Sequence, residues 1–356
     1  MDVPTLTGII AENIETKRLK TRVLFTEKKI GSPVLFIHGN ASSATYWEEI
    51  MLGLPDNFWG LAPDLRGYGG ADPEKLVDAT KGCGDWVEDL IALLDHLKIQ
   101  KTHVCAHSLG GNVTWALMTA IPDRILSVTQ VDASSPYGFG GTKDNQGTPT
   151  YDDFASSGGG VVNPEFTKLM KEGDRGEDNP QASPRIVMNT FYFKPPFRAA
   201  REEDLLTSMM SEHVGDKQYP GDFVKSPNWP SVAPGKWGPI NALSPKYLLN
   251  KVSVLLTVSP KPKVLWIRGS DDQIVSDNSF FDFGTLGKIG AVPGWPGDEV
   301  CPPQPMVSQI RSVLDKYAKQ GGVYSEVVID GTGHCCFIEK PADFNQHFHK
   351  FLKENS

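Results

Sequence analysis

The stretch VCAHSLGG, residues 104–111, constrains the fold more strongly than any other part of the chain. Strand-forming residues end abruptly at Ser108, and apolar residues then recur at helical spacing over residues 113–121. A serine between a buried strand and a helix lies on a sharp, crowded turn, so its neighbours must be small. The first turn of the helix directs its backbone amides toward the same point. The pattern therefore predicts a strand, a tight turn that carries Ser108, and a helix.

Short apolar segments alternate with helical patterns on both sides of this unit. Segments this apolar are typical of strands buried on both faces, which belong to parallel sheets covered by helices. The sequence therefore predicts an α/β fold with a mostly parallel central sheet and helices on both faces. The expected strands lie at 32–39, within 58–69, and at 102–108, 127–134, 262–269 and 324–331, and the expected helices at 83–98, 110–121 and after Pro341.

Residues 135–255 interrupt the alternation of strands and helices. They are rich in Gly, Pro, Ser and charged residues, yet they still contain helical patterns. We therefore expect a core made of residues 1–134 and 256–356, with an inserted cap at 135–255. A second long irregular stretch, residues 276–305, contains the sequences GWPG and CPPQP. Loops of this length are usually functional or disordered.

Two later stretches place reactive side chains directly after expected strands. Asp271 and Asp272 follow the strand at 262–269, and His334 lies in a glycine-rich turn after the strand at 324–331. A serine hydroxyl is a weak nucleophile unless a base lies within about 3 Å, and that base in turn needs an orienting acid. In proteins that carry a serine on this kind of strand–turn–helix unit, the orienting acid follows the serine along the chain and the histidine follows the acid. This sequence has the same order.

We predict that Ser108 is the nucleophile, His334 the general base and Asp272 the orienting acid. Asp272 is preferred because it has G-x-x-D spacing and precedes two apolar residues. The alternative acid is Asp271, which is otherwise a loop or helix-cap carboxylate. Asp132, after the fourth expected strand, is a more remote alternative and is interpreted as a strand-end residue. The plain alternatives are an N-cap serine at 108 and a structural or surface histidine at 334.

The FIHGN stretch, residues 36–40, places a tight turn after the first expected strand. We predict that the backbone amides of Asn40 and Leu109 form an oxyanion hole. Such a site requires hydrogen-bond donors that already point to the place where negative charge will develop. The Asn40 side chain has two interpretations, a substrate contact or a role in the turn.

Together these motifs resemble the α/β-hydrolase superfamily, in its cap-bearing branch of serine esterases and lactonases. The resemblance covers about residues 1–134 and 260–356. It implies the α/β-hydrolase fold and a Ser-His-Asp mechanism, and it does not imply a substrate. The matching stretches are 38–40, 64–69, 106–111, 269–272, 333–334 and 339–341.

Two further features follow from the comparison with this superfamily. Asp64 and Arg66, in the stretch DLRGYG, are predicted to be structural ties in a turn. The interval between Asp272 and His334 is longer than the superfamily leads us to expect, and the loop at 276–305 accounts for most of the difference.

The triad and the resemblance favour a serine hydrolase that cleaves a carboxylic ester or a lactone. Aromatic and Met residues in the cap favour a hydrophobic or aromatic small-molecule substrate. A serine in place of an aspartate at position 108 disfavours haloalkane dehalogenases and epoxide hydrolases. The same triad also serves carbon–carbon hydrolases, amidases and cofactor-free perhydrolases, and a ligand receptor on this fold is the alternative outside enzymes. No metal or organic cofactor is expected.

Charge and hydropathy exclude several other partners. The net charge of −8 and the isoelectric point near 5.5 argue against nucleic acid and anionic membranes. No run approaches 18 apolar residues, so we expect no membrane span. The N-terminal sequence lacks a signal-peptide pattern, and we expect a cytoplasmic protein, although removal of an export signal would leave the same sequence. The oligomeric state stays open.

The five cysteines are odd in number and lack metal-site spacing. We expect free thiols in a reducing compartment. Cys335 and Cys336 directly follow His334, and they are predicted to be small buried thiols under the histidine loop. A vicinal disulfide or a redox-sensing role is the alternative.

Overall fold

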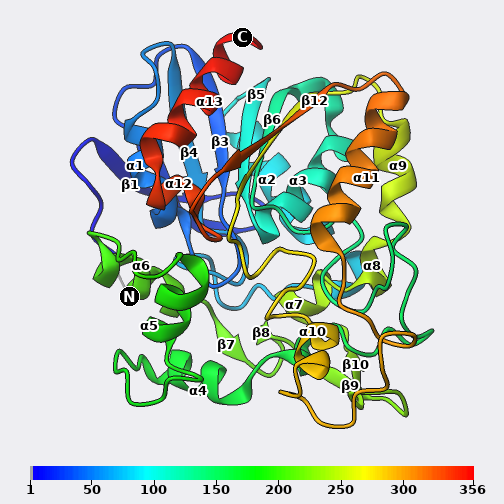
Figure 1. Cartoon of the computed structure of the whole chain (residues 1–356). Coiled ribbons are helices and arrows are strands. Elements are labelled where there is room, and N and C mark those ends of the chain that lie inside the picture. Colours follow the sequence, from blue (N-terminus) through cyan, green and yellow to red (C-terminus); the bar gives the residue numbers. More distant parts are fainter. Residues whose placement is uncertain (1–2) are drawn as a thin grey trace.

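A sheet of eight strands runs through the centre of the computed structural model, which describes residues 3–356 (Figure 1). The strand order is β1-β2-β4-β3-β5-β6-β11-β12, and the six strands from β4 to β12 pair in parallel. This arrangement confirms the predicted fold class. The strands are β1 (Ile9–Glu15), β2 (Lys20–Thr26), β3 (Ser32–Ile37), β4 (Phe58–Pro63), β5 (Thr102–His107), β6 (Ile125–Val131), β11 (Lys263–Gly269) and β12 (Tyr324–Ile329).

The antiparallel hairpin of β1 and β2 at one edge of the sheet is absent from the sequence expectation. In β1 only Ile9 and Ile14 are buried, and the residues between them are exposed. An edge strand that is exposed over most of its length carries no apolar run, and so it gives no strand signal of the kind used to find the central strands.

Helices cover both faces of the sheet. Figure 1 shows α12 and α13 in front of the sheet and α2 and α3 behind it. Helix α2 is amphipathic, and its buried positions include Trp86, Leu90 and Leu94, as its helical spacing predicts. The helices outside the inserted part of the chain and the loop at 276–305 are α1 (Glu48–Leu52), α2 (Gly84–His96), α3 (Leu109–Ala120), α11 (Met306–Lys319), α12 (Cys336–Glu339) and α13 (Pro341–Lys353). Short 3₁₀ turns lie at Ala44–Trp47, Ala79–Lys81 and Pro122–Arg124.

The chain between β6 and β11, residues 132–262, is called the inserted segment here. Most of it lies below the sheet in Figure 1, coloured green to yellow, whereas its last helix lies beside α11. Its four short strands pair only in two separate two-stranded sheets. The elements are α4 (Pro164–Glu172), α5 (Pro184–Val187), a π-helical turn (Met188–Tyr192), α6 (Glu202–Met210), α7 (Pro239–Ala242), α8 (Pro245–Leu248), α9 (Lys251–Thr257), β7 (Val214–Gly215), β8 (Tyr219–Pro220), β9 (Phe223–Lys225), β10 (Val232–Pro234) and a 3₁₀ turn (Gly159–Val161).

The boundary expected between residues 255 and 256 falls inside helix α9, which packs against α3 and α11. The division into a core and a cap stays a prediction. The long loop at 276–305 contains one short helix, α10 (Phe283–Lys288), whose N-cap Asp282 accepts a hydrogen bond from the backbone of Thr285.

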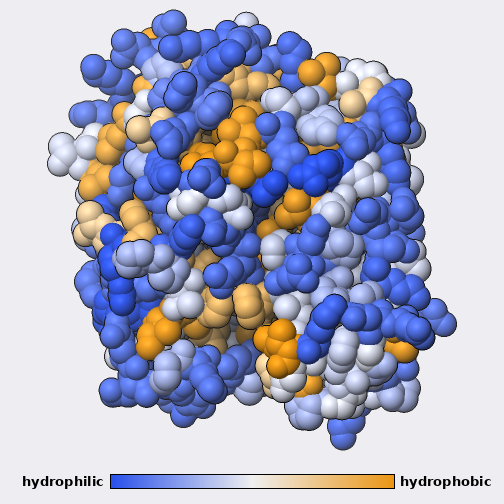
Figure 2. Space-filling view, in the orientation of Figure 1, coloured by the Kyte–Doolittle hydropathy of each residue, from blue (hydrophilic) through white to orange (hydrophobic). Residues whose placement is uncertain are grey.

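The outer surface is mostly hydrophilic on the face drawn in Figure 2, where apolar residues form separate groups. Exposed large apolar side chains include Phe280 and Ile289 in the long loop and Phe223 in β9. Within the described residues, no helix combines the length and the apolar character needed to cross a bilayer.

Asp64 and Arg66 are structural ties, as predicted. The Asp64 carboxylate accepts hydrogen bonds from Arg22 Nε at 2.9 Å and from the backbone amides of Ala44 and Gly70 at 2.9 and 2.8 Å. These contacts anchor the turn after β4 to the chain that follows β3.

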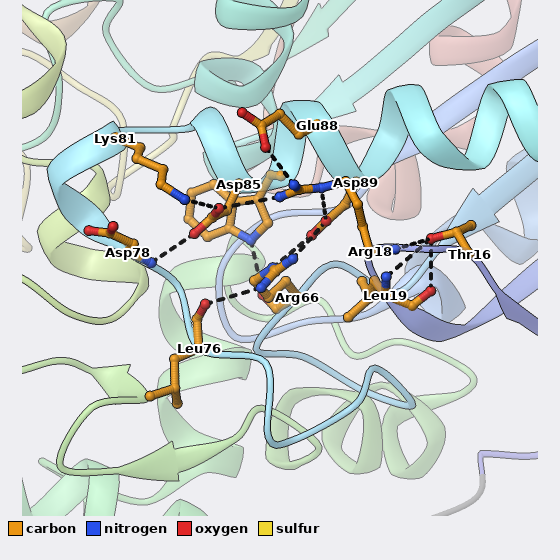
Figure 3. Close-up of polar contacts among 11 residues, drawn as sticks. Thr16, Arg18, Leu19, Arg66, Leu76, Asp78, Lys81, Asp85, Glu88 and Asp89 are labelled. Carbon is orange, nitrogen blue, oxygen red and sulfur yellow. Dashed lines mark hydrogen bonds and ion pairs between the residues drawn. The ribbon is translucent and has the colours of Figure 1, made fainter.

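Arg66 forms a two-point ion pair with Asp89 of α2, drawn in Figure 3. Arg66 Nε and Nη2 each lie 2.7 Å from an Asp89 oxygen, and both side chains are almost completely buried. Arg18 adds a third hydrogen bond to Asp89 at 2.9 Å, and the Trp86 indole donates to the Arg66 carbonyl at 2.9 Å. The pair fixes the turn after β4 against α2.

We expect Arg66→Leu to lower the free energy of unfolding by about 3 kcal/mol, because it leaves the buried Asp89 carboxylate with Arg18 as its remaining cation. The control is Lys168→Leu, which breaks an exposed pair with Glu165 and should cost less than about 1 kcal/mol. Urea unfolding of both variants measures the difference. Equal losses would contradict a structural role for the buried pair.

Candidate active site

The topology of the sheet determines where a site can form. Strand β3 lies between β4 and β5, so the chain leaves β3 toward one neighbour and later returns to its other side. In open α/β sheets, ligands bind at such a reversal, outside the carboxyl ends of the strands. Ser108 follows β5 and the turn at 38–40 follows β3, so both lie at this point. Asp272 and His334 follow β11 and β12, so they also lie beyond the carboxyl ends of the parallel strands.

Ser108 occupies a strained turn between β5 and α3. Its backbone angles are φ 54° and ψ −118°, which a residue with a side chain rarely adopts. Its N–H donates to the Val131 carbonyl at 3.1 Å. A Cβ added to Gly110 would lie 2.6 Å from the carbonyl oxygens of Ile37 and His38. Glycine at position 110 is therefore required by the close approach of α3 to the end of β3.

His334 and Asp272 form a buried hydrogen-bonded pair. His334 Nδ1 lies 2.8 Å from Asp272 Oδ2, and both side chains are at most 3% exposed. The second oxygen of Asp272 accepts from the backbone amides of Ile274 and Val275 at 2.8 and 3.0 Å. A carboxylate only accepts hydrogen bonds, so Nδ1 carries the proton of the pair; in the neutral tautomer with this proton, the lone pair is on Nε2.

Within residues 3–356, neither of the two alternative acids is hydrogen-bonded to His334. Asp271 has a side chain that is 37% exposed, and it pairs with Lys194 Nζ at 2.9 Å. Hydrogen bonds from Ser270 and Lys194 hold the pKa of Asp271 below its usual value. Asp132 is buried at the end of β6, and its Oδ1 accepts from the Gly269 amide at 2.7 Å. Burial and the nearby Asp272 raise the pKa of Asp132, and its contact with β11 agrees with a strand-end role.

His107 joins the nucleophile turn to the histidine loop. Its Nε2–H donates to the His334 carbonyl at 2.8 Å, and the two rings are 4.6 Å apart. Burial lowers the pKa of His107 well below its usual value, so the ring is neutral. The hydrogen bonds within residues 3–356 include none from Ser108 Oγ to His334 Nε2. In enzymes without substrate this contact is often longer than in the working complex.

The turn at 38–40 lies directly against Ser108. A Cβ added to Gly39 would lie 2.9 Å from Ser108 Cβ. His38 holds this turn. The Leu65 amide donates to His38 Nε2 at 3.0 Å, so the proton lies on Nδ1 and is donated to the Gly39 carbonyl at 2.8 Å. Burial lowers the pKa of His38 to about 4, which keeps the ring neutral.

Two backbone amides beside Ser108 remain available. Leu109 begins α3, and the first amides of a helix have no partner within it. Among residues 3–356, neither the Leu109 amide nor the Asn40 amide donates to another protein group. The Asn40 side chain accepts from Tyr68 Oη at 3.0 Å, which agrees with the turn role. The oxyanion hole itself stays a prediction.

Cys335 and Cys336 are free and fully buried, in line with the interpretation as small packed thiols. Burial raises the pKa of both thiols well above the usual value, which disfavours the reactive thiolate. Within the described part of the chain, His, Cys, Asp and Glu side chains form no group of three or more that is placed to bind a metal ion.

The open cavity found beside α3 is not at the candidate site. It has a volume of about 180 Å³, and its lining includes Lys81, Trp115 and Leu255 but neither Ser108 nor His334. Ser108 itself is 7% exposed. The apolar pocket expected above Ser108 therefore stays a prediction.

Sequence comparison agrees with this geometry. The family described as "Alpha/beta hydrolase family" matches residues 34–347. The chain belongs to the alpha/beta hydrolase family. Its similarity to solved structures extends over nearly the whole fold. A thermophilic esterase from Thermogutta terrifontis matches 98% of this alpha/beta hydrolase and 100% of its own chain, with a TM-score of 0.55 and 17% identity. At that identity the match concerns the fold alone.

Curated relatives of this alpha/beta hydrolase match over shorter regions. The 2-(acetamidomethylene)succinate hydrolase of Mesorhizobium japonicum is 31% identical over 129 residues, which is 36% of this chain and 44% of the relative. The 2-hydroxymuconate semialdehyde hydrolase of a Pseudomonas species is 27% identical over 128 residues, 35% of this chain and 44% of the relative. The matched region thus spans less than half the length of either relative.

The strain at Ser108 has a measurable consequence. We expect Ser108→Gly to be about 1 kcal/mol more stable than Ser108→Ala, because only glycine adopts this backbone without strain. The control pair is Ser253→Gly and Ser253→Ala, in the exposed middle of α9, where alanine should be the more stable by about 0.5–1 kcal/mol. Urea unfolding compares the pairs, and the same order at both sites would contradict a strained turn.

Proposed function

We propose that this alpha/beta hydrolase cleaves a carboxylic ester or a lactone of a small molecule through an acyl-enzyme. The observation that carries the proposal is the strained turn of Ser108 at the sheet reversal, joined through His107 to a loop whose His334 is bonded to Asp272. If Ser108 only capped a helix, its role would not require a buried imidazole–carboxylate pair on a neighbouring loop.

In the proposed first step, His334 Nε2 takes the proton from Ser108 Oγ while Oγ attacks the carbonyl carbon. Asp272 holds the imidazole in place and balances the charge of the imidazolium. The carbonyl oxygen becomes an oxyanion, which the amides of Asn40 and Leu109 stabilise. Each such donor is worth roughly 3 kcal/mol of the barrier. His334 then passes its proton to the departing alcohol oxygen, and the acyl group stays on Ser108.

In the second step, water replaces the alcohol. His334 takes a proton from the water, the hydroxide attacks the acyl carbon, and the Ser108 oxygen leaves with that proton. The balance is one ester and one water giving one acid and one alcohol. With a lactone, the acid and the alcohol remain in one molecule. These steps use only protein groups and water.

The family resemblance supports a hydrolase of small molecules, and the fold of the Thermogutta esterase is compatible with ester cleavage. The inserted segment supplies several buried aromatic and Met side chains, including Met188, Tyr192 and Phe193, which favours an apolar or aromatic acyl group. The names of the two curated relatives describe other hydrolase substrates. Cleavage of a carbon–carbon or amide bond and perhydrolysis are therefore outcomes of the test, as is a receptor that binds without turnover.

The first experiment is hydrolysis of p-nitrophenyl esters from acetate to palmitate, with lactones and an anilide beside them. We expect turnover that peaks on an ester or a lactone and is lost in Ser108→Ala, together with fluorophosphonate labelling of Ser108. Labelling without ester or lactone turnover would reject the ester substrate and favour the carbon–carbon or amide alternative. Neither labelling nor turnover would reject the serine mechanism and favour the receptor.

The neighbouring aspartates provide a matched test of the acid. We expect Asp272→Asn to lower kcat by about 10⁴-fold, because the amide holds the imidazole in the wrong tautomer. Asp271→Asn should leave kcat little changed, because Asp271 is partly exposed and pairs with Lys194. Steady-state kinetics on the best ester measures both variants. A large loss in Asp271→Asn with a small loss in Asp272→Asn would reverse the assignment.

A further inference from the structure

Tyr192 is the residue through which the inserted segment contacts two loops of the candidate site. It is the last residue of the π-helical turn Met188–Tyr192, and it is 6% exposed. Such turns are rare and occur frequently at functional sites. Both its side chain and its backbone carbonyl are used, each toward a different loop.

The side chain holds the turn after β3. Tyr192 Oη donates to the Asn40 carbonyl at 2.8 Å. The Asn40 N–H belongs to the peptide between Gly39 and Asn40. This peptide is planar, so the Asn40 N–H points opposite to the Gly39 C=O. That C=O accepts from Ser42 Oγ at 2.9 Å and from His38 Nδ1 at 2.8 Å. The peptides on both sides of the Asn40 Cα are therefore held, one by core residues and one by Tyr192.

The backbone and the ring of Tyr192 hold the histidine loop. The Cys335 amide, next to His334, donates to the Tyr192 carbonyl at 2.8 Å. The Tyr192 ring lies edge-on to the His334 ring, with centroids 5.8 Å apart and an interplanar angle of 83°. A shift of Tyr192 would therefore act on the imidazole and on the peptide after Asn40, which is joined to the Asn40 amide through a single Cα.

The residues that follow Tyr192 add further contacts on the side of the histidine loop. The Lys194 amide donates to Glu339 Oε2 at 2.8 Å, and the Gly333 amide donates to Glu339 Oε1 at 2.7 Å. Lys194 Nζ also pairs with Asp271 at 2.9 Å. The chain just beyond Tyr192 is thus connected through the Glu339 carboxylate to Gly333, the residue before His334, whereas the Asn40 carbonyl is held by one hydroxyl.

We propose that Tyr192 is a positioning residue that keeps the Asn40 amide and the His334 imidazole in one fixed arrangement. The inference rests on the proposed function, because it assumes that the Asn40 amide stabilises an oxyanion. Negative charge forms on the carbonyl oxygen only in the transition state. A misdirected amide therefore lowers kcat and leaves KM almost unchanged.

The test is Tyr192→Phe, which keeps the ring and the backbone carbonyl and removes only the hydroxyl. Loss of a direct oxyanion donor lowers kcat by about 10²–10³-fold, so a donor that is only loosened should lower it by about 10-fold. We expect this loss in kcat for the best ester, an unchanged KM, and a comparable fall in the second-order rate of fluorophosphonate labelling. Melting temperatures are recorded, and rates are compared well below the lowest of them.

The matched control is Tyr46→Phe. Tyr46 is a buried tyrosine of the same region, with its ring 6.3 Å from that of Tyr192. Its hydroxyl lies 3.4 Å from the Leu205 carbonyl and 3.6 Å from Met188 Sδ, and among the described residues it forms no hydrogen bond to the turn at 38–40. Loss of this hydroxyl should leave kcat and the labelling rate close to those of the unaltered protein.

The outcomes separate the inference from the function on which it rests. If Tyr192→Phe keeps the labelling rate and the kcat of the unaltered protein, as Tyr46→Phe is expected to do, the positioning role is overturned and the serine mechanism stays intact. An equal fall in both variants would also overturn it, because the effect would then come from packing. A protein whose Ser108 neither labels nor turns over an ester would overturn both.

Discussion

The parallel pairing of β5 with β3 and β6 is the constraint on which the rest of the candidate site depends. The register aligns Ile37 with Ala106 and His107 with Val131, so the three strands end nearly level. The turns that follow them begin at one edge of the sheet for that reason. A slip of one residue would turn every side chain of β5 to the opposite face. It would also carry Ser108 away from the turn at 38–40, which it now contacts closely.

Burial then decides how the hydrogen bonds at this edge are directed. His38 and His107 are fully buried and neutral, so each ring has one N–H and one lone pair. His38 uses both between the Leu65 amide and the Gly39 carbonyl, and His107 donates to the His334 carbonyl. A charged ring would have two donors and would lose the Leu65 contact. The neutral state of His38 and His107 is therefore part of the hydrogen-bonded arrangement that connects these loops.

The parts of this structure that could be predicted from the sequence are the local ones. The turn at Ser108, the central strands and the acidic and histidine turns each have a signal within a few residues. The choice of Asp272 over Asp271 also follows from spacing, and the contact with His334 agrees with it. The exposed strand β1 contains no apolar run, and the roles of His107 and Tyr192 depend on partners 227 and 152 positions away. No pattern within a single stretch carries such contacts.

The loop at 276–305, which lengthens the interval between Asp272 and His334, is connected in space with the inserted segment. Gln304 of the loop accepts from the Gly140 amide at 2.6 Å and donates to the Gly138 carbonyl at 3.1 Å. Trp229 of the inserted segment donates to the Pro293 carbonyl at 2.9 Å. The long loop is therefore an ordered support for the inserted segment. Because that segment also contacts the histidine loop through Tyr192, the long loop supports the part of the chain that adjoins the candidate site.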